Sequence, residues 1–569
     1  MKLRYCIVLL AAVLAPALMR AQDLVLQDYT SSGNKYLNTL VYQDTSSAEF
    51  KAGTRVYVLK KDGIYLLNGN LATVSGSKLN FRSEYGGTGH YKPTVYLFPT
   101  ANGNPPPNFA TLTGGSLTLK NIMISGYYEP IDSNLDRQQG ALILVNTSGT
   151  GASVYVDSCI LKSVNGNAIR TDGKPTTVRV TNTIFGDLGF VGNSNFGAGK
   201  AIDLRDQDVD TCDIQNCTFV NMQDRTVRHY QATKGPIRNF IFNHNTVVNS
   251  LSYHGFLSLG RVDSSGGGIL QIKNNLLVDH FALGADTAYL RQGEFGDPGE
   301  LDPVNGKPRM AWILTNPNSA AKWDISNNYY VISDSGKAML NLTPPNAPYY
   351  KNLGPALTWG INKKLAADGK DTNATFKQVT LKLAKTPPLM TELIRWIYRP
   401  RSEGGDGKEK NSGDANFTKL GAGNWKYDYN RRLIEYYADT LNCRISASAS
   451  VVSQLVSSDG KTVGDPRWGS PLTAVKVSEM TPNVFALEQN FPNPFNPSTT
   501  IKYQVPAAGL VTLTVYNVVG QQVATLVNQV QEAAAYETSF DASHLSSGLY
   551  FYTLRSGSFV STKKMMLLK

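Results

Sequence analysis

Residues 270–277 read LQIKNNLL, an alternating stretch that runs into a polar corner and then an apolar pair. The same octet pattern recurs as LTLKNIMI, VYVDSCIL, VRVTNTIF, CDIQNCTF, FIFNHNTV and WDISNNYY. Aligned on the corner, the copies place one residue each in a single column: Asn121, Ser158, Asn182, Asn216, His244, Asn274 and Asn327. Each copy predicts a short strand whose apolar face cannot be buried by that unit alone.

The copies follow one another at intervals of roughly 24 to 37 residues, with one longer interval of about 53, as in stacked supersecondary units. We therefore predict an all-β chain, a right-handed parallel β-helix followed by a small C-terminal β-sandwich. Equivalent side chains on successive turns then form ladders about 4.8 Å apart. An Asn at a sharp corner tolerates the left-handed conformation. An antiparallel sandwich is the alternative, but it does not require a repeated octet.

Composition and the first residues indicate an exported protein. The 569 residues are 41% hydrophobic with a mean hydropathy of −0.23, which excludes disorder and a membrane protein. No apolar run beyond the first 20 residues is long enough to span a bilayer. Lys2 and Arg4 precede the apolar run 6–18, the pattern of a cleaved signal peptide over residues 1–21. A cut after Ala17 is the alternative.

Four cysteines remain after signal removal: Cys159, Cys212, Cys217 and Cys443. Cys159 and Cys217 share a column two turns apart, about 9.6 Å, which is too far for a disulfide. No spacing among the cysteines suggests zinc. We predict packed free thiols.

The C-terminal segment carries an ordered series of residues: NFPNPFNP over 490–497, VYN over 515–517, Gly520, GLY over 548–550, and Lys563 and Lys564. It therefore resembles the type A C-terminal sorting domain of the type IX secretion system. The resemblance implies export across the outer membrane by that machinery, removal of the domain, and release or attachment at the cell surface. Strands broken at Pro506, Gly520 and Gly548 predict a small β-sandwich. An ordinary fibronectin-like module is the alternative.

The predicted organisation places a β-helix domain at 24–470, a linker at 471–484 and the sorting domain at 485–569. Residues 52–87 resemble the capping turns of a pectate lyase-type β-helix. SDGKTVGDPRW at 458–468 resembles the closing motif of an uncharacterised Bacteroidetes β-helix family allied to chondroitinase B-like lyases. The Asp series of polygalacturonases and the Arg-x-Pro-x-x-Arg motif of pectate lyases are missing, so a hydrolytic Asp pair is not supported.

Strands that follow the corners carry basic residues, and their predicted inward column is Ile169, Ile202, Val227, Leu257 and Tyr289. The next position is predicted to point outward and holds Arg170, Asp203, Arg228 and Ser258. Arg205 and Tyr230 are expected to share an outward column two residues later. The edges of this basic face are expected to hold Lys200, Arg225, His229, Arg261 and Arg291. Exposed ion pairs worth about 0 to 1 kcal/mol each are the alternative interpretation.

Arg and Lys along parallel strands suit the repeated carboxylates or sulfates of an acidic polysaccharide. The formal net charge of +11 agrees. A secreted β-helix without a nucleic-acid motif gives no reason to expect nucleic acid. We expect a monomer without a transmembrane segment, whose predicted substrate-binding residues are Arg170, Asp203, Arg205 and Arg261.

Cleavage by β-elimination needs a neutralised uronate carboxylate, a base for the C5 proton and an acid for the leaving oxygen. The predicted catalytic residues are Lys200 or Arg228 as the base and Tyr230 or His229 as the acid. Lys200 is the easier base because the pKa of a free Arg lies above 12. No metal ligands are predicted. Calcium is the one candidate cofactor, through Asp297, Glu300 and Asp302, although their spacing matches no calcium loop and a solvated acidic turn is the alternative.

An irregular insertion at about 386–439 interrupts the repeat. Its aromatic residues could cover the groove and stack on sugars, or simply pack; they include Trp396, Trp425, Tyr427 and Tyr429. Two functional classes follow from the sequence. One is a polysaccharide lyase or another glycan-cleaving enzyme, and the other is a non-catalytic glycan-binding or adhesive surface protein.

Overall fold

The computed structural model describes most of residues 23–468 and 485–568. The longer stretches outside the described residues are 1–22, 127–139, 190–198, 283–308, 314–321, 335–355, 358–375, 386–440, 447–454 and 469–484. The chain divides into two compact units, residues 1–469 and 470–569. No helix among the described residues is long and apolar enough to cross a membrane.

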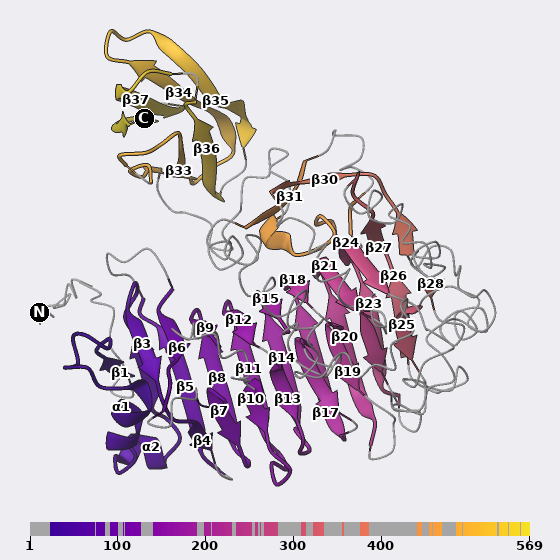
Figure 1. The fold of residues 1–569 in the computed structure, drawn as a ribbon. Coiled ribbons are helices and arrows are strands. Elements are labelled where there is room, and N and C mark those ends of the chain that lie inside the picture. The colour runs from indigo at the N-terminus through magenta and orange to yellow at the C-terminus, as the bar shows by residue number, and fades with distance from the viewer. Residues whose placement is uncertain are drawn as a thin grey trace, which may run out of the picture. The chain divides into compact units, whose positions relative to one another are not determined.

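The first unit is a coil of parallel strands that form three sheets (Figure 1). Sheet I contains β1 (Asp23–Leu26), β2 (Val56–Leu59), β5 (Lys78–Ser83), β8 (Ser116–Lys120), β11 (Ser153–Asp157), β14 (Thr177–Thr181), β17 (Val209–Gln215), β20 (Ile237–Asn243), β23 (Ile269–Lys273) and β26 (Lys322–Ser326). Sheet II contains β3 (Ile64–Leu67), β6 (Thr94–Leu97), β9 (Met123–Ser125), β12 (Ile160–Val164), β15 (Ile184–Leu188), β18 (Thr218–Met222), β21 (Thr246–Ser252), β24 (Leu276–Ala282), β27 (Asn328–Val331) and β29 (Phe376–Gln378).

Sheet III contains β4 (Leu71–Thr73), β7 (Ala110–Leu112), β10 (Ala141–Val145), β13 (Asn167–Thr171), β16 (Ile202–Arg205), β19 (Val227–His229), β22 (Leu257–Leu259), β25 (Arg309–Ile313) and β28 (Ala356–Leu357). Each turn visits sheets I, II and III in that order, and strands at the same place on successive turns pair in parallel. The predicted parallel β-helix is confirmed, and the antiparallel sandwich is wrong for this unit.

The aligned corner column lies between sheets I and II, and all seven of its residues are left-handed, with φ between 51° and 57°. A second left-handed column, with φ between 50° and 57°, lies within the strands of sheet II and was not predicted; it holds Ser163, Asp187, Asn221, Asn249 and Asp279. Side-chain amides in both columns bond from turn to turn. Asn327 Nδ2 donates to Asn274 Oδ1 at 2.9 Å in the first column, and Asn249 Nδ2 donates to Asn221 Oδ1 at 3.2 Å in the second.

A buried Asn ladder follows the first corner directly and consists of Asn245, Asn275 and Asn328, each 0% exposed. The side-chain oxygen of Asn275 accepts from the backbone N–H of Asn245 at 2.8 Å. Its amide nitrogen donates to the carbonyl oxygen of Phe242 at 3.0 Å. Because buried amides are stable only when hydrogen-bonded, this ladder fixes the vertical register of the turns.

The interior is filled by ladders of apolar side chains. Ile169 pairs with Ile202, Ile202 with Val227, and Val227 with Leu257, and all four are 0% exposed. The predicted inward column is therefore confirmed over these residues, while Tyr289 lies outside the described residues. Phe185 and Phe219 form a parallel stack with ring centroids 4.9 Å apart. The four predicted free cysteines are buried and unbridged.

Helices and a closing segment cover parts of the coil. Near the N-terminus, α1 (Leu37–Gln43) contributes two side chains to the core, and α2 (Ala48–Lys51) follows it. The outer face of sheet II is covered by an apolar layer from β30 (Lys382–Lys385), β31 (Asn442–Ser446) and residues 455–468, which end in the 3₁₀ turn η5 (Pro466–Trp468). We call residues 455–468 the closing segment.

The second unit contains two antiparallel sheets around its own core. One sheet comprises β32 (Ala486–Leu487), β33 (Ser498–Val505) and β36 (Ala534–Asp541). The other comprises β34 (Gly509–Asn517), β35 (Gln522–Gln531), β37 (Gly548–Ser556) and β38 (Phe559–Leu567). The predicted β-sandwich is thus present.

Candidate functional site

The predicted outward column of the basic face lies on sheet III. Arg170 of β13 pairs with Asp203 of β16, Asp203 with Arg228 of β19, and Arg228 with Ser258 of β22. The alternation that buries the Ile and Val ladder inside the coil turns these residues to the outer side of the sheet. The predicted register of this column is therefore correct.

Exposure of this column is not as predicted. Asp203 is 1% exposed, Arg228 6%, and Lys200 and His229 are both 0% exposed. Arg225, expected at an edge of the face, is also buried. The prediction of an open basic face is wrong for these residues. Opposite charges on neighbouring turns lie within ion-pair distance, which offsets the cost of removing them from water.

Lys200 lies at the centre of a buried charge cluster. Its Nζ lies 3.0 Å from Asp224 Oδ2, and Arg225 Nε donates to Asp224 Oδ1 at 3.3 Å. Burial lowers the pKa of Lys200 to about 8, with the Asp224 carboxylate opposing that shift and the Arg228 charge adding to it. Lys200 is the candidate base that the sequence favoured, and Asp224 is the partner that it missed, since no repeat position marks Asp224.

Asp203 joins the cluster to the strands on either side. It receives Arg228 Nη1 at 3.4 Å and Asn167 Nδ2 at 3.5 Å. Burial raises the pKa of Asp203, but the charges of Arg228 and Lys200 outweigh burial and lower it. Asp203 is therefore a carboxylate that holds Arg228, and its 1% exposure leaves it out of reach of a substrate on the surface, contrary to its predicted role in substrate binding.

Arg205 departs from the predicted register. A β-bulge between β16 and β19 pairs it with His229, where the sequence predicted Tyr230. Its φ is 54°, and its backbone N–H donates to Asp203 Oδ1 at 3.2 Å. The left-handed turn changes the direction of the chain at this point. His229 Nε2 lies 2.8 Å from the carbonyl oxygen of Gln207 and donates to it.

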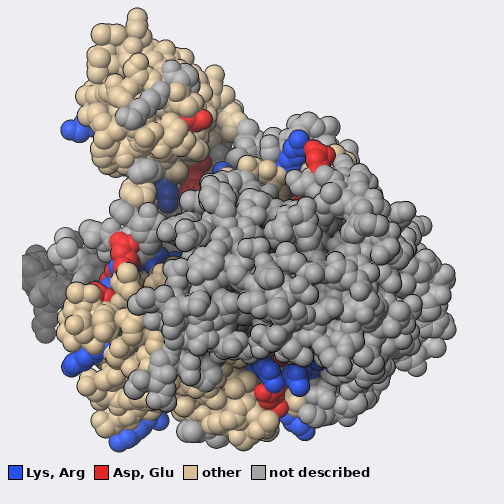
Figure 2. Space-filling model, viewed as in Figure 1, with Lys and Arg blue, Asp and Glu red and all other residues tan. Residues whose placement is uncertain are grey.

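Two arginines remain partly exposed on the outer side of sheet III. Arg170 Nε lies 3.0 Å from Asp172 Oδ1, and Arg205 Nε lies 3.7 Å from the same oxygen. The side chains of Arg170 and Arg205 are 32% and 39% exposed. Both guanidinium groups lie near the same Asp172 carboxylate. Among the described residues of the basic face, Arg170 and Arg205 are the arginines that solvent reaches. Figure 2 shows basic and acidic residues of the described part side by side in small groups.

Several predicted residues lie outside the described residues: Tyr230, Arg261, Arg291, Asp297, Glu300, Asp302 and the insertion at 386–439. Among the described residues no group of three or more His, Cys, Asp and Glu side chains could hold a metal ion. Calcium therefore stays a prediction.

The buried ion pair of Arg228 predicts a large effect of truncation. Replacing Arg228 by Ala leaves the Asp203 carboxylate buried without this pair, so we expect the free energy of unfolding to fall by about 3–5 kcal/mol. Replacing the partly exposed Arg170 by Ala is the matched control and should cost less than about 1 kcal/mol. Urea denaturation of both variants measures the difference. Equal losses would contradict the buried-pair assignment.

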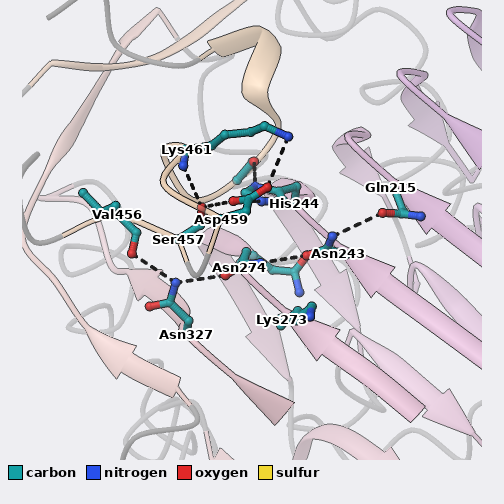
Figure 3. Close-up of polar contacts among 12 residues, drawn as sticks. Gln215, Asn243, His244, Lys273, Asn274, Asn327, Val456, Ser457, Asp459 and Lys461 are labelled. Carbon is teal, nitrogen blue, oxygen red and sulfur yellow. Dashed lines mark hydrogen bonds and ion pairs between the residues drawn. The ribbon is translucent and has the colours of Figure 1, made fainter. Parts of the chain in front are cut away.

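A second polar cluster joins the closing segment to the corner column (Figure 3). His244, only 2% exposed, lies with Nε2 3.0 Å from Asp459 Oδ1 and Nδ1 3.2 Å from the carbonyl oxygen of Gly464. Further along, Thr218 donates to Asp465 Oδ2 at 2.7 Å, and Trp468 Nε1 donates to Thr218 Oγ1 at 2.6 Å. The 458–468 motif therefore docks onto turns more than 200 residues earlier in the chain.

Residues 489–568 match the family model of the secretion system C-terminal sorting domain. The chain is thus a secreted surface protein, built as a parallel β-helix that carries a type IX sorting domain. The comparisons with curated proteins and with solved structures returned no match. The likeness of the first unit to lyase-allied β-helix proteins, and the signal peptide, stay predictions.

Proposed function

We propose that this secreted β-helix protein binds an acidic polysaccharide on the outer side of sheet III. The observation that carries the proposal is the pair Arg170 and Arg205, two partly exposed guanidinium groups on adjacent strands around Asp172. A guanidinium can bind a carboxylate or sulfate through two parallel hydrogen bonds. Strands spaced about 4.8 Å apart repeat along the coil, as charges repeat along a uronic acid polymer.

The buried charge cluster lies next to this site and contributes to it through its charges and through its contact with the Arg205 backbone. Lys200, Arg225 and Arg228 contribute three cations and Asp203 and Asp224 two carboxylates, all nearly or fully buried. Charges held in low dielectric act over longer distances than solvated ones. The cluster also fixes the backbone that carries Arg205, because Asp203 accepts from its N–H.

Replacing Arg170 and Arg205 together by Ala should weaken binding of polygalacturonate about tenfold at low salt and flatten the salt dependence, because two exposed charged contacts are lost. The matched control is Arg179→Ala on sheet I, whose side chain is 51% exposed and pairs with Asp213 at 2.9 Å. Binding is measured by titration in increasing NaCl, with dextran as the neutral glycan. Unchanged polygalacturonate binding by the double variant would refute the proposal.

Lyase activity is a second candidate function, favoured by the lowered pKa of Lys200. A neutral Lys200 amine could take the C5 proton of a uronate, whose electron pair then forms the C4–C5 double bond as the O4 substituent leaves with a proton from an acid. Tyr230 or His229 stays the proposed acid. His229 is the weaker choice because its Nε2 already donates to Gln207. Lys200 is 0% exposed, so this role requires the chain around it to open.

The lyase hypothesis predicts a rate that rises with pH through about 8, because the base acts as the free amine and the pKa of Lys200 is about 8. The assay incubates the protein with a panel of uronic acid polysaccharides and follows the absorbance of the unsaturated product. Lys200→Gln should abolish the signal, whereas Arg179→Ala should retain it. Polyanion binding without product from any polymer supports the non-catalytic alternative.

A further inference from the structure

The closing segment crosses the corner column of the coil and is held there through His244. This residue occupies a position that Asn fills on neighbouring turns, at Asn216 and Asn274, and it shares their left-handed conformation with φ of 54°. At the next turn, the corner residue Asn274 donates from Nδ2 to the side-chain oxygen of Asn243 on the turn before it, at 2.9 Å. His244 bonds to the closing segment through both ring nitrogens.

Both partners of the His244 ring are acceptors. The Gly464 carbonyl oxygen can only accept, so Nδ1 must carry a hydrogen. Partial burial raises the pKa of Asp459, but hydrogen bonds from Ser457, Lys461 and His244 lower it well below its usual range, so Asp459 is a carboxylate. Nε2 must then carry a hydrogen as well. Both contacts are hydrogen bonds at the same time only when the imidazole carries a hydrogen on each ring nitrogen.

We propose that His244 and Asp459 form a pH-dependent latch, in which protonation of His244 holds the closing segment against the corner of the β-helix. Docking and proton uptake are then linked, because the undocked ring needs only one ring proton. The latch is therefore strengthened at lower pH and weakens as pH rises.

The other charged groups around the latch set the acid limit below which the Asp459 carboxylate is lost. Lys461 Nζ lies 3.1 Å from Asp459 Oδ2 and keeps the carboxylate ionised. On the adjacent strand Lys273 pairs with Asp324 at 3.1 Å. Burial raises the pKa of Asp465, which lies behind the latch, while Arg467 opposes the shift. Because the pKa of Asp459 is lowered, its contribution is present above the pKa of a free carboxyl and is lost only in strong acid.

The closing segment also leads directly toward the linker predicted at 471–484. Val463 and Leu455 pack in the apolar layer over sheet II, and Gly464 N–H donates to the Asn274 carbonyl oxygen at 2.8 Å. Release of the latch removes the His244 contacts of this segment, while the Thr218–Asp465 and Trp468–Thr218 hydrogen bonds remain. The latch thus couples the pH around the cell to the end of the β-helix unit, whatever ligand the protein binds.

The test is hydrogen exchange with mass spectrometry on the purified full chain between pH 5.5 and 8.5, corrected for intrinsic exchange rates. Wild-type peptides from 455–468 should lose protection about tenfold as pH rises, because a hydrogen bond to a charged group is lost. His244→Asn keeps the corner geometry and should lower protection at pH 5.5 and remove the pH dependence. The peptide covering β23 is the internal control and should stay protected.

A second variant covers the case in which His244→Asn disturbs the fold of the corner. Asp459 is 43% exposed, so Asp459→Asn leaves the coil intact while removing the carboxylate partner of His244. It should reproduce the loss of pH dependence. Protection of 455–468 that is independent of pH in the wild type, or equal in wild type and His244→Asn at pH 5.5, overturns the latch.

Discussion

Replacing Ile202 by Asp should prevent the β-helix from folding. Ile202 is 0% exposed and lies between Ile169 and Val227 on the inward ladder of sheet III. A carboxylate here would be buried among aliphatic side chains without a partner, at a cost of several kcal/mol or more. Typical domains are stable by only about 5–15 kcal/mol, so this cost is a large part of the total. In a stacked repeat each turn also packs only on its neighbours, so the turn of Ile202 would no longer pack against the turns of Ile169 and Val227.

The matched control is Ile202→Val, which removes one methylene from the same place and should cost about 0.5–1.5 kcal/mol. Circular dichroism and thermal melting of the soluble fraction distinguish the two outcomes. A soluble Asp variant that melts cooperatively near the wild-type temperature would show that Ile202 is not part of the packed ladder.

Deleting residues 485–569 should stop secretion and leave the protein in the periplasm, since the sorting domain lies wholly within the deleted segment. The β-helix should still fold. Its core cluster and the core cluster of the second unit share no residues. Cell fractionation and protease treatment of intact cells locate the chain, and thermal melting of the recovered protein reports the fold of the first unit.

Point substitutions in the full-length chain test whether secretion depends on the folded sorting domain or only on the presence of residues 485–569. Ile501 is 0% exposed in the core of the second unit, so Ile501→Asp should unfold that unit and trap the protein. Val518 is 65% exposed, so Val518→Asp is the control and should be secreted normally. Surface display of the deletion variant contradicts the need for the sorting domain.

The repeated octets predicted the fold because periodicity reports directly on which side chains face the core. Asn121 and its equivalents were placed at the left-handed corner, and Ile169, Ile202, Val227 and Leu257 were placed on one ladder, as the structure has them. The residue after the corner Asn, such as Asn275, occupies a position to which the repeated pattern assigned no role. Its role as a buried hydrogen-bonding residue depends on the carbonyl groups of the previous turn.

The candidate site was predicted less well than the fold. Alternation showed that Asp203 and Arg228 point away from the interior, but it carries no information on whether the outer side is covered. A one-residue bulge at Arg205 was enough to replace Tyr230 by His229 as its neighbour. Asp224 and Asp459 contact Lys200 and His244 only in three dimensions, so no sequence spacing marks them.

The corner between sheets I and II is the part of each turn whose length stays nearly constant, and we call it the spine of the β-helix unit. From β8 to β26 the connection there contains only one or two residues on every turn, as between β23 and β24. Turns with very different numbers of residues therefore share the same short corner. Over this range the number of residues per turn varies mainly through the connections into and out of sheet III. Evolution, or a protein engineer, can lengthen those connections to build new recognition loops while the spine keeps each turn in step with the next.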